Sequence, residues 1–190
     1  MTSIIIKNLS KVRKLSAFIF AVVSSVAFHQ MLYLIGQYSG KGDYIVTMFC
    51  PTTLSIIFFG LLAGPVVGAM SGLISPIISS LITGFPDCTG TLLMMIEVSS
   101  AGLLAGAIKN LDFCNVLKVL ISLIFSRITR TIANFVLYFF IGNTKYELLD
   151  SWKSIPHSLP GIVLHLIIIP LMMYYFYTVE KSDSTNDESD

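Results

Sequence analysis

The sequence predicts an all-α membrane protein, a bundle of six transmembrane helices, on three observations. Of its 190 residues, 54% are hydrophobic and only 12% are charged, whereas soluble proteins carry about 25% charged residues. Several apolar runs reach the roughly 20 residues that a helix needs to cross about 30 Å of hydrocarbon. No run shows the alternating polarity of a barrel strand, and a bilayer offers no water to unpaired backbone groups, so helices are expected.

We expect one transmembrane domain, residues 15–179. It follows a basic segment, residues 1–14, and precedes an acidic, Ser-rich tail, residues 180–190, that is expected to be disordered. The expected spans are 15–35, 44–63, 65–84, 90–108, 117–141 and 159–179. Prolines within the second, third and sixth spans predict either broken helices around a cavity or ordinary kinks. These prolines are Pro51, Pro76, Pro160 and Pro170.

The distribution of basic residues predicts how the bundle is oriented. One side of the expected membrane carries Lys7, Lys11, Arg13, Lys14, Lys109, Lys118 and Lys181, and the other carries Lys41, Lys145 and Lys153. Because cytoplasmic ends of membrane helices carry the excess of lysine and arginine, both termini are expected in the cytoplasm. The segments 36–43, 85–89 and 142–158 are then external.

Several functional classes lack their sequence signatures. The net charge is +1 and no basic run is interleaved with aromatic residues, so no nucleic-acid partner is expected. The chain contains no Gly-rich phosphate loop, no H-E-x-x-H motif and no G-x-S-x-G motif, so we expect neither an enzyme nor ATP hydrolysis by this chain. Cys50, Cys88 and Cys114 lack the spacing of metal ligands and are interpreted as packing residues, so no metal site is expected.

Apart from Lys118 at the very start of a span, three charged residues fall inside the expected spans: Glu97, Arg127 and Arg130. A charge at such depth costs about 2.5–3.5 kcal/mol, so these side chains should face the bundle interior and pair. At about 1.5 Å per residue, Glu97 lies about 20 Å from the inner edge and Arg130 about 18 Å, against about 14 Å for Arg127. Glu97 and Arg130 are the better-matched pair. Either they form a structural ion pair, or they serve gating or anion binding, with Arg127 as the anion contact.

Two histidines share one expected depth. His29 and His165 each lie about 9 Å from the outer ends of the first and sixth spans. That geometry suits axial ligation of a tetrapyrrole metal or hydrogen bonding to a smaller ligand. The alternative is a hydrogen bond from each histidine to a neighbouring helix. No cofactor is expected to be intrinsic, and heme or cobalamin would be transported cargo.

Small residues recur at intervals of four. Gly60, Gly64, Gly68 and Gly72 form one such series, and Ala17 with Ala21 forms a shorter one. Small residues at this spacing let helix backbones approach closely in lipid, where no hydrophobic force drives helix association. The pattern predicts either internal packing or a face that grips another membrane protein, and Ala17 with Ala21 is the preferred candidate for such a face.

Three stretches resemble a known family. They are F-G-L-L-A-G-P-V-V-G-A-M-S-G-L-I-S-P-I-I-S-S-L-I-T-G-F-P (59–86), M-M-I-E-V-S-S-A-G-L-L-A-G (94–106) and P-G-I-V-L-H-L-I-I-I-P (160–170). Together they resemble the substrate-binding S components of energy-coupling factor (ECF) transporters, over roughly residues 15–175. The resemblance implies a six-helix subunit that captures a vitamin-like micronutrient outside the cell. Its partners would be a transmembrane T component and two cytoplasmic ATPases.

The resemblance also implies where the ligand would bind. In that family the loops between spans one and two and between spans three and four, with the outer parts of spans four to six, enclose it. The implied contacts are Tyr33, Gln37, Tyr38, Tyr44, Phe85, Glu97, Asn134 and His165, to which the reasoning on charge and depth adds His29 and Arg127. Ala17-x-x-x-Ala21 looks like the surface that docks on the T component. Where glutamine is expected in P-G-I-x-L-x-L this chain has His165, which favours heme or a corrinoid such as cobalamin.

A structural protein is the principal alternative. A six-helix membrane scaffold of the cell-shape type, similar to the rod-shape determinant MreD, would have comparable size and hydropathy. A scaffold needs no sealed external pocket, whereas an importer subunit must trap a small molecule. The chain has 190 residues and shows no two repeated halves. It is therefore short for an autonomous alternating-access carrier, which favours a binder driven by a partner.

Overall fold

The computed structural model describes residues 11–40, 42–141 and 155–187, and the regular secondary structure in this part of the chain is all α-helix. The helices are α1 (Lys11–Tyr38), α2 (Gly42–Phe49), α3 (Pro51–Ala63), α4 (Pro65–Thr83), α5 (Cys88–Ala107), α6 (Asn115–Ile141) and α8 (Ile155–Asp187). Five segments are long and apolar enough to cross a bilayer, with α2 and α3 together forming one of them. The protein is therefore an all-α, multi-pass membrane protein.

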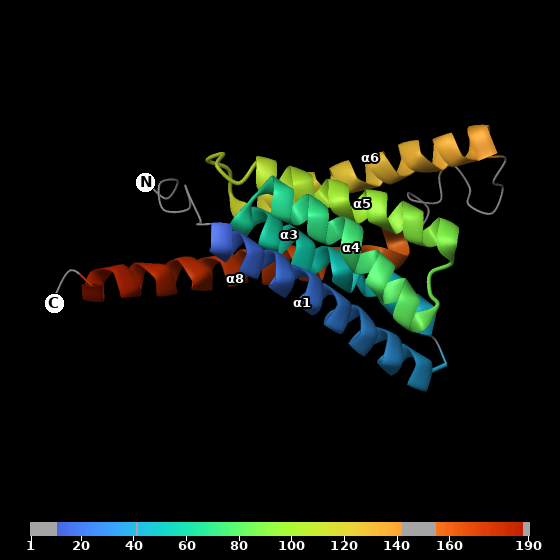
Figure 1. Ribbon diagram of the computed structural model, residues 1–190, viewed down its shortest axis with the longest axis horizontal. Helices are drawn as coiled ribbons and strands as arrows, with labels where there is room; N and C mark the ends of the chain where they lie inside the picture. Colours follow the sequence, from blue (N-terminus) through green and yellow to red (C-terminus); the bar gives the residue numbers. More distant parts are fainter. Residues whose placement is uncertain (1–10, 41, 142–154, 188–190) are drawn as a thin grey trace.

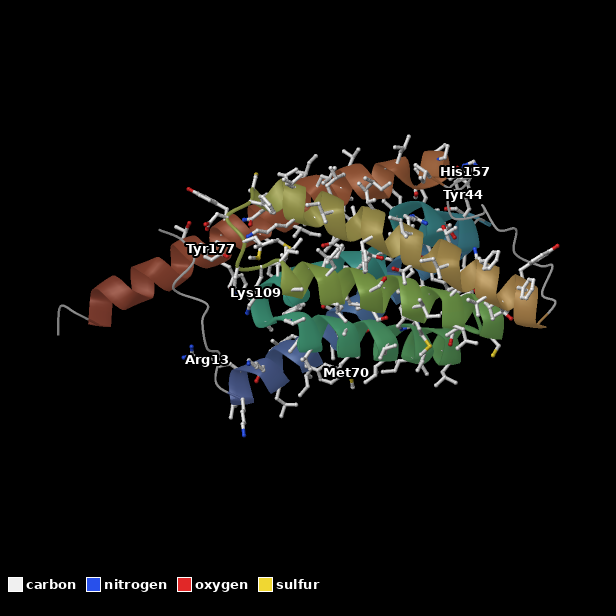
Figure 2. All side chains as sticks on the ribbon, turned by 90° about the horizontal axis from the view of Figure 1, so that it is seen from above. Arg13, Tyr44, Met70, Lys109, His157 and Tyr177 are labelled. Carbon is white, nitrogen blue, oxygen red and sulfur yellow. The ribbon has the colours of Figure 1, made fainter. Side chains whose placement is uncertain are left out.

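The long helices lie side by side in one bundle (Figure 1). α5 packs against α3, α4 and α6, while α1 covers α3 and α4, and α8 contacts α2, α3 and α6. The start of α1 and the end of α8 lie toward the same end of the bundle (Figure 1). Figure 2 shows Arg13, Lys109 and Tyr177 toward this end, and Tyr44 with His157 at the opposite one. We call these the terminal end and the distal end.

Basic residues gather at the terminal end. Lys118 Nζ donates a hydrogen bond to the Lys109 carbonyl oxygen at 2.9 Å, which caps the connection between α5 and α6. Burial lowers the pKa of the Lys109 ammonium group, and the nearby positive charge of Lys14 lowers it further. The start of α1 and the end of α5 are thus close together, as expected if both lie on the basic, cytoplasmic side.

Glycines bring the backbones of α4 and α5 into direct contact. A Cβ atom added at Gly68 would meet the backbone of Gly102, and one added at Gly102 would meet the backbone of Gly68. A Cβ at Gly72 would meet the Ser99 backbone, and one at Gly106 would meet Pro65. The glycine series therefore serves internal packing, in which small residues allow helices to approach in lipid.

The prediction that Ala17 and Ala21 form a partner-docking surface is wrong in this structure. Ala17 is 8% exposed and Ala21 is fully buried, and Ala17 packs with Ala63 of α3 and Val67 of α4. The protein's own helices thus occupy this face of α1. The physical reason is that a helix at the margin of a bundle places its smallest residues where backbones approach most closely and turns large apolar residues, such as Phe20, outward.

Only one of the proline positions breaks a helix. Cys50, with φ +45°, separates α2 from α3, and its N–H donates to the Val46 carbonyl oxygen at 2.9 Å to end α2. Pro51 then occupies the first position of α3, where its missing N–H costs nothing. The remaining prolines, Pro76, Pro160 and Pro170, lie inside continuous helices. The broken-helix alternative therefore holds for the second span, whereas the third and sixth are unbroken.

The acidic tail also differs from expectation. α8 continues to Asp187, so residues 180–187 are helical rather than disordered. No glycine or proline follows Pro170 in the sequence, and extending an established helix costs far less than starting one. Residues 188–190, the first part of the basic segment and most of the loop 142–158 lie outside the described residues.

The contact between α4 and α5 gives a stability test. Alanine normally favours a helix by about 1 kcal/mol over glycine, but Gly102→Ala should instead destabilise this protein by about 1–3 kcal/mol because its methyl group overpacks the contact with Gly68. Thermal unfolding of the detergent-solubilised protein measures the effect. Leu103→Ala, at an exposed position of the same helix, is the control. A Gly102→Ala protein as stable as wild type would show that the backbones do not touch.

Candidate functional site

The described residues surround a cavity of about 750 Å³ between α2, α3, α5, α6 and α8, with one contribution from α1. Cavities of roughly 300–1,000 Å³ are typical of small-molecule sites. The α4–α5 connection, with Gly84, Phe85, Pro86 and Asp87, forms one border. This connection lies at the distal end of the bundle (Figure 1), so the cavity that it borders reaches toward that end.

Glu97 of α5 and two arginines of α6 form a charged cluster in the cavity wall. Arg130 Nη1 lies 2.6 Å from Glu97 Oε2, and Arg127 Nη1 lies 3.2 Å from Glu97 Oε1. The pair of Glu97 with Arg130 is the one that the depth argument predicts. Arg127 also contacts this carboxylate, although its expected depth matches less well, because residues three apart share one face of a helix and α6 therefore presents both arginines to Glu97.

The cluster extends to a third helix. Arg127 Nη2 donates a hydrogen bond to Ser158 Oγ at 3.2 Å, and Ser158 Oγ donates to the Ile155 carbonyl oxygen in the first turn of α8. Glu97, Arg127 and Ser158 thus connect α5, α6 and α8 around the cavity. Burying charges is unfavourable unless each is paired and hydrogen-bonded, so these contacts fix the relative positions of the three helices.

His29 and His165 line the same cavity from α1 and α8. His29 Nδ1 lies 3.3 Å from Thr52 Oγ1 at the start of α3, and His165 Nδ1 hydrogen-bonds to the Gly161 carbonyl oxygen one turn earlier in α8. A carbonyl only accepts, so the neutral His165 ring carries its proton on Nδ1 and leaves Nε2 as an acceptor. The Cys50 carbonyl oxygen also lies close to this ring and interacts with it. Neither Nε2 has a hydrogen-bond partner among the described residues.

Gly161 positions His165 against the helix break. A Cβ atom added at Gly161 would meet the carbonyl oxygens of Met48 and Phe49 at 2.6 and 2.8 Å. Only glycine therefore lets α8 approach the end of α2 this closely. His165 follows one turn later on the same face of α8, so the Pro160–Gly161 sequence places the imidazole beside the break.

Hydrogen bonds fix both ends of the α4–α5 connection. Thr83 Oγ1 donates to the Phe85 carbonyl oxygen at 2.9 Å, and Asp87 caps α5 by accepting the Gly90 N–H at 3.2 Å. The Phe85 ring lies stacked with Tyr33 of α1, with ring centroids 6.2 Å apart. Tyr33 therefore supports the cavity border from behind.

Of the ten predicted ligand contacts, five line the cavity and five do not. His29, Phe85, Glu97, Arg127 and His165 line the cavity. The other five, Tyr33, Gln37, Tyr38, Tyr44 and Asn134, lie outside its lining. Gln37 donates to the Tyr33 hydroxyl at 2.8 Å, Tyr38 is 97% exposed, and Tyr44 packs edge-on against His157. Asn134 is buried, and its side-chain amide makes no hydrogen bond within the described chain.

Several polar wall residues were not among the predicted contacts. They are Thr47, Cys50, Thr53, Asp87, Ser126 and Ser158. Cys50 donates its thiol hydrogen to the Thr47 carbonyl oxygen at 3.1 Å. The available signal was the proline after Cys50 in the middle of an apolar run, since the residue before proline is displaced from helical geometry. Hydroxyl residues in apolar spans carry no such signal, because most bond their own helix.

No set of three or more His, Cys, Asp or Glu side chains that could hold a metal ion occurs among the described residues. No family model, no curated protein and no solved structure matches this chain at a significant level. Fold and site together define a multi-pass membrane protein with a cavity that combines an apolar wall, one charged cluster and two histidines.

The charged cluster gives a second test. Glu97→Gln leaves Arg127 and Arg130 without their carboxylate, and breaking a buried pair in this way costs about 3–5 kcal/mol. We expect a clear drop in the melting temperature of the detergent-solubilised protein. The double variant Glu97→Gln/Arg130→Gln removes one positive charge as well and should recover part of the loss. Unchanged melting of the single variant would show that the ion pairs contribute no stability.

Proposed function

We propose that the protein is the substrate-binding subunit of a membrane importer, of the ECF S-component type. The cavity carries this proposal, because it is large enough for a vitamin-sized molecule and reaches toward the distal end of the bundle. Ionisable residues inside membrane spans typically mark substrate pathways, and Glu97, Arg127 and Arg130 all line this cavity. A scaffold of the cell-shape type has no use for a cavity of this size with a charged cluster in its wall.

The proposed subunit depends on partners for energy. The sequence contains no Gly-rich phosphate loop, so a T component and two cytoplasmic ATPases would drive release of the ligand. The cargo would be a vitamin or a related micronutrient. Heme or cobalamin is one candidate class, because His29 and His165 both line the cavity with Nε2 unpaired.

Filling the cavity tests the proposal. Wild-type protein purified from native membranes should retain a small molecule that mass spectrometry identifies after extraction, and a tetrapyrrole would also show visible absorbance. Met94→Trp places an indole into the cavity and should abolish retention. Ile96→Trp lies on the exposed side of the same helix and should leave retention unchanged. Equal retention by both variants, or no ligand in folded wild-type protein, would contradict the proposal.

A further inference from the structure

We propose that the ligand of this cavity is an organic carboxylate whose anionic group binds to Arg127. This inference rests on the proposed function and names its substrate class. The guanidinium group of arginine has five N–H donors in a planar fork that matches a carboxylate. Arg127 uses Nη1 toward Glu97 and Nη2 toward Ser158, and its side chain also lies close to the Cys50 thiol. Its side chain is 15% exposed and lines the cavity, so part of the fork remains open to a ligand.

The electrostatics of the wall favour an anion. Glu97 lies closer to Arg130, at 2.6 Å, than to Arg127, at 3.2 Å, so its charge is shared unequally. Asp87 also lines the cavity, but its carboxylate accepts the N–H of Gly90 at the positive end of α5. Asp87 and Arg130 both have further interactions within the protein. Arg127 is therefore the charged group of the wall that is best placed to receive an added negative charge.

The remaining wall suits an apolar body with one donor group. Leu120, Leu123 and Ile124 of α6 and Met94 of α5 supply apolar surface. His29 and His165 each present an unpaired Nε2 atom to the buried region. His165 lies close enough to Arg127 to interact with its charge. A ligand with a carboxylate near Arg127 and an N–H or O–H group near the histidines would satisfy both kinds of site.

Cys50 supplies a readout of occupancy that is independent of transport. It lines the cavity, whereas Cys88 and Cys114 are exposed. In a Cys88→Ser/Cys114→Ser background, alkylation of Cys50 by N-ethylmaleimide should slow when the cavity is filled. We would titrate matched pairs of probes: nicotinate against nicotinamide, biotin against its amide, and pantothenate against panthenol. The native ligand extracted from the wild-type protein would be tested in the same way against its methyl ester or amide.

We expect at least one acid to protect Cys50, with its neutral counterpart at least tenfold weaker. Arg127→Gln should weaken the acid at least tenfold and remove the preference for the acid form. Arg127→Lys keeps the charge without the planar fork and should retain an intermediate preference, provided that its melting curve shows folded protein. Lys11→Gln removes the same charge at an exposed position outside the cavity and should change nothing.

Two outcomes distinguish a failure of the carboxylate inference from a failure of the proposed function. If a neutral or cationic compound protects Cys50 and Arg127→Gln leaves its affinity unchanged, the carboxylate inference is wrong and the proposed function stands. If neither the probes nor the extract of folded wild-type protein contains a compound that protects Cys50, the inference and the proposed function fail together.

Discussion

The carboxylate of Glu97, shared by Arg127 and Arg130, is the constraint on which the cavity depends. α5 meets its neighbours in two different ways. Toward α4 it presents Gly102 and lets the backbones touch, whereas toward α6 it presents Glu97 and is held through long side chains. Helices joined through arginine side chains stand further apart than helices joined through glycine, so the same helix packs tightly on one face and borders a hollow on the other.

The interruption at Cys50 and Pro51 closes the opposite side of this hollow. It ends α2 and starts α3 within the bundle, where non-helical backbone is tolerated only beside other protein groups or a polar cavity. Gly161 brings α8 onto the carbonyl oxygens at the end of α2, and Thr52 in the first turn of α3 contacts His29. One proline in the middle of an apolar run thus organises both histidines.

Composition and run length were sufficient to predict the helices and their borders to within a few residues, apart from the helical extension of α8. Six spans are expected from the sequence, but five candidate spans are found, and α6, the helix of the expected span 117–141, is not among them. Depth along a helix follows from about 1.5 Å per residue, which is why the contact between Glu97 and Arg130 could be anticipated. The neighbour that a side chain faces depends on how the helix is rotated in the bundle, which a single sequence does not reveal. For that reason the sequence does not reveal that Ala17 faces α3 and α4 or that Tyr38 points outward. The contact of Arg127 with Glu97 follows from the helix face that Arg127 shares with Arg130, which depth alone does not show.

The length of α8 has a consequence of its own. Its 33 residues would measure about 50 Å, against about 30 Å of hydrocarbon. The apolar part ends at Thr178, so the final nine residues, Val179 to Asp187, carry the helix about 13 Å further. The last part of α8 would therefore project beyond the bilayer surface as a helix. A protein that approaches this surface beside α8 would meet backbone that is already helical.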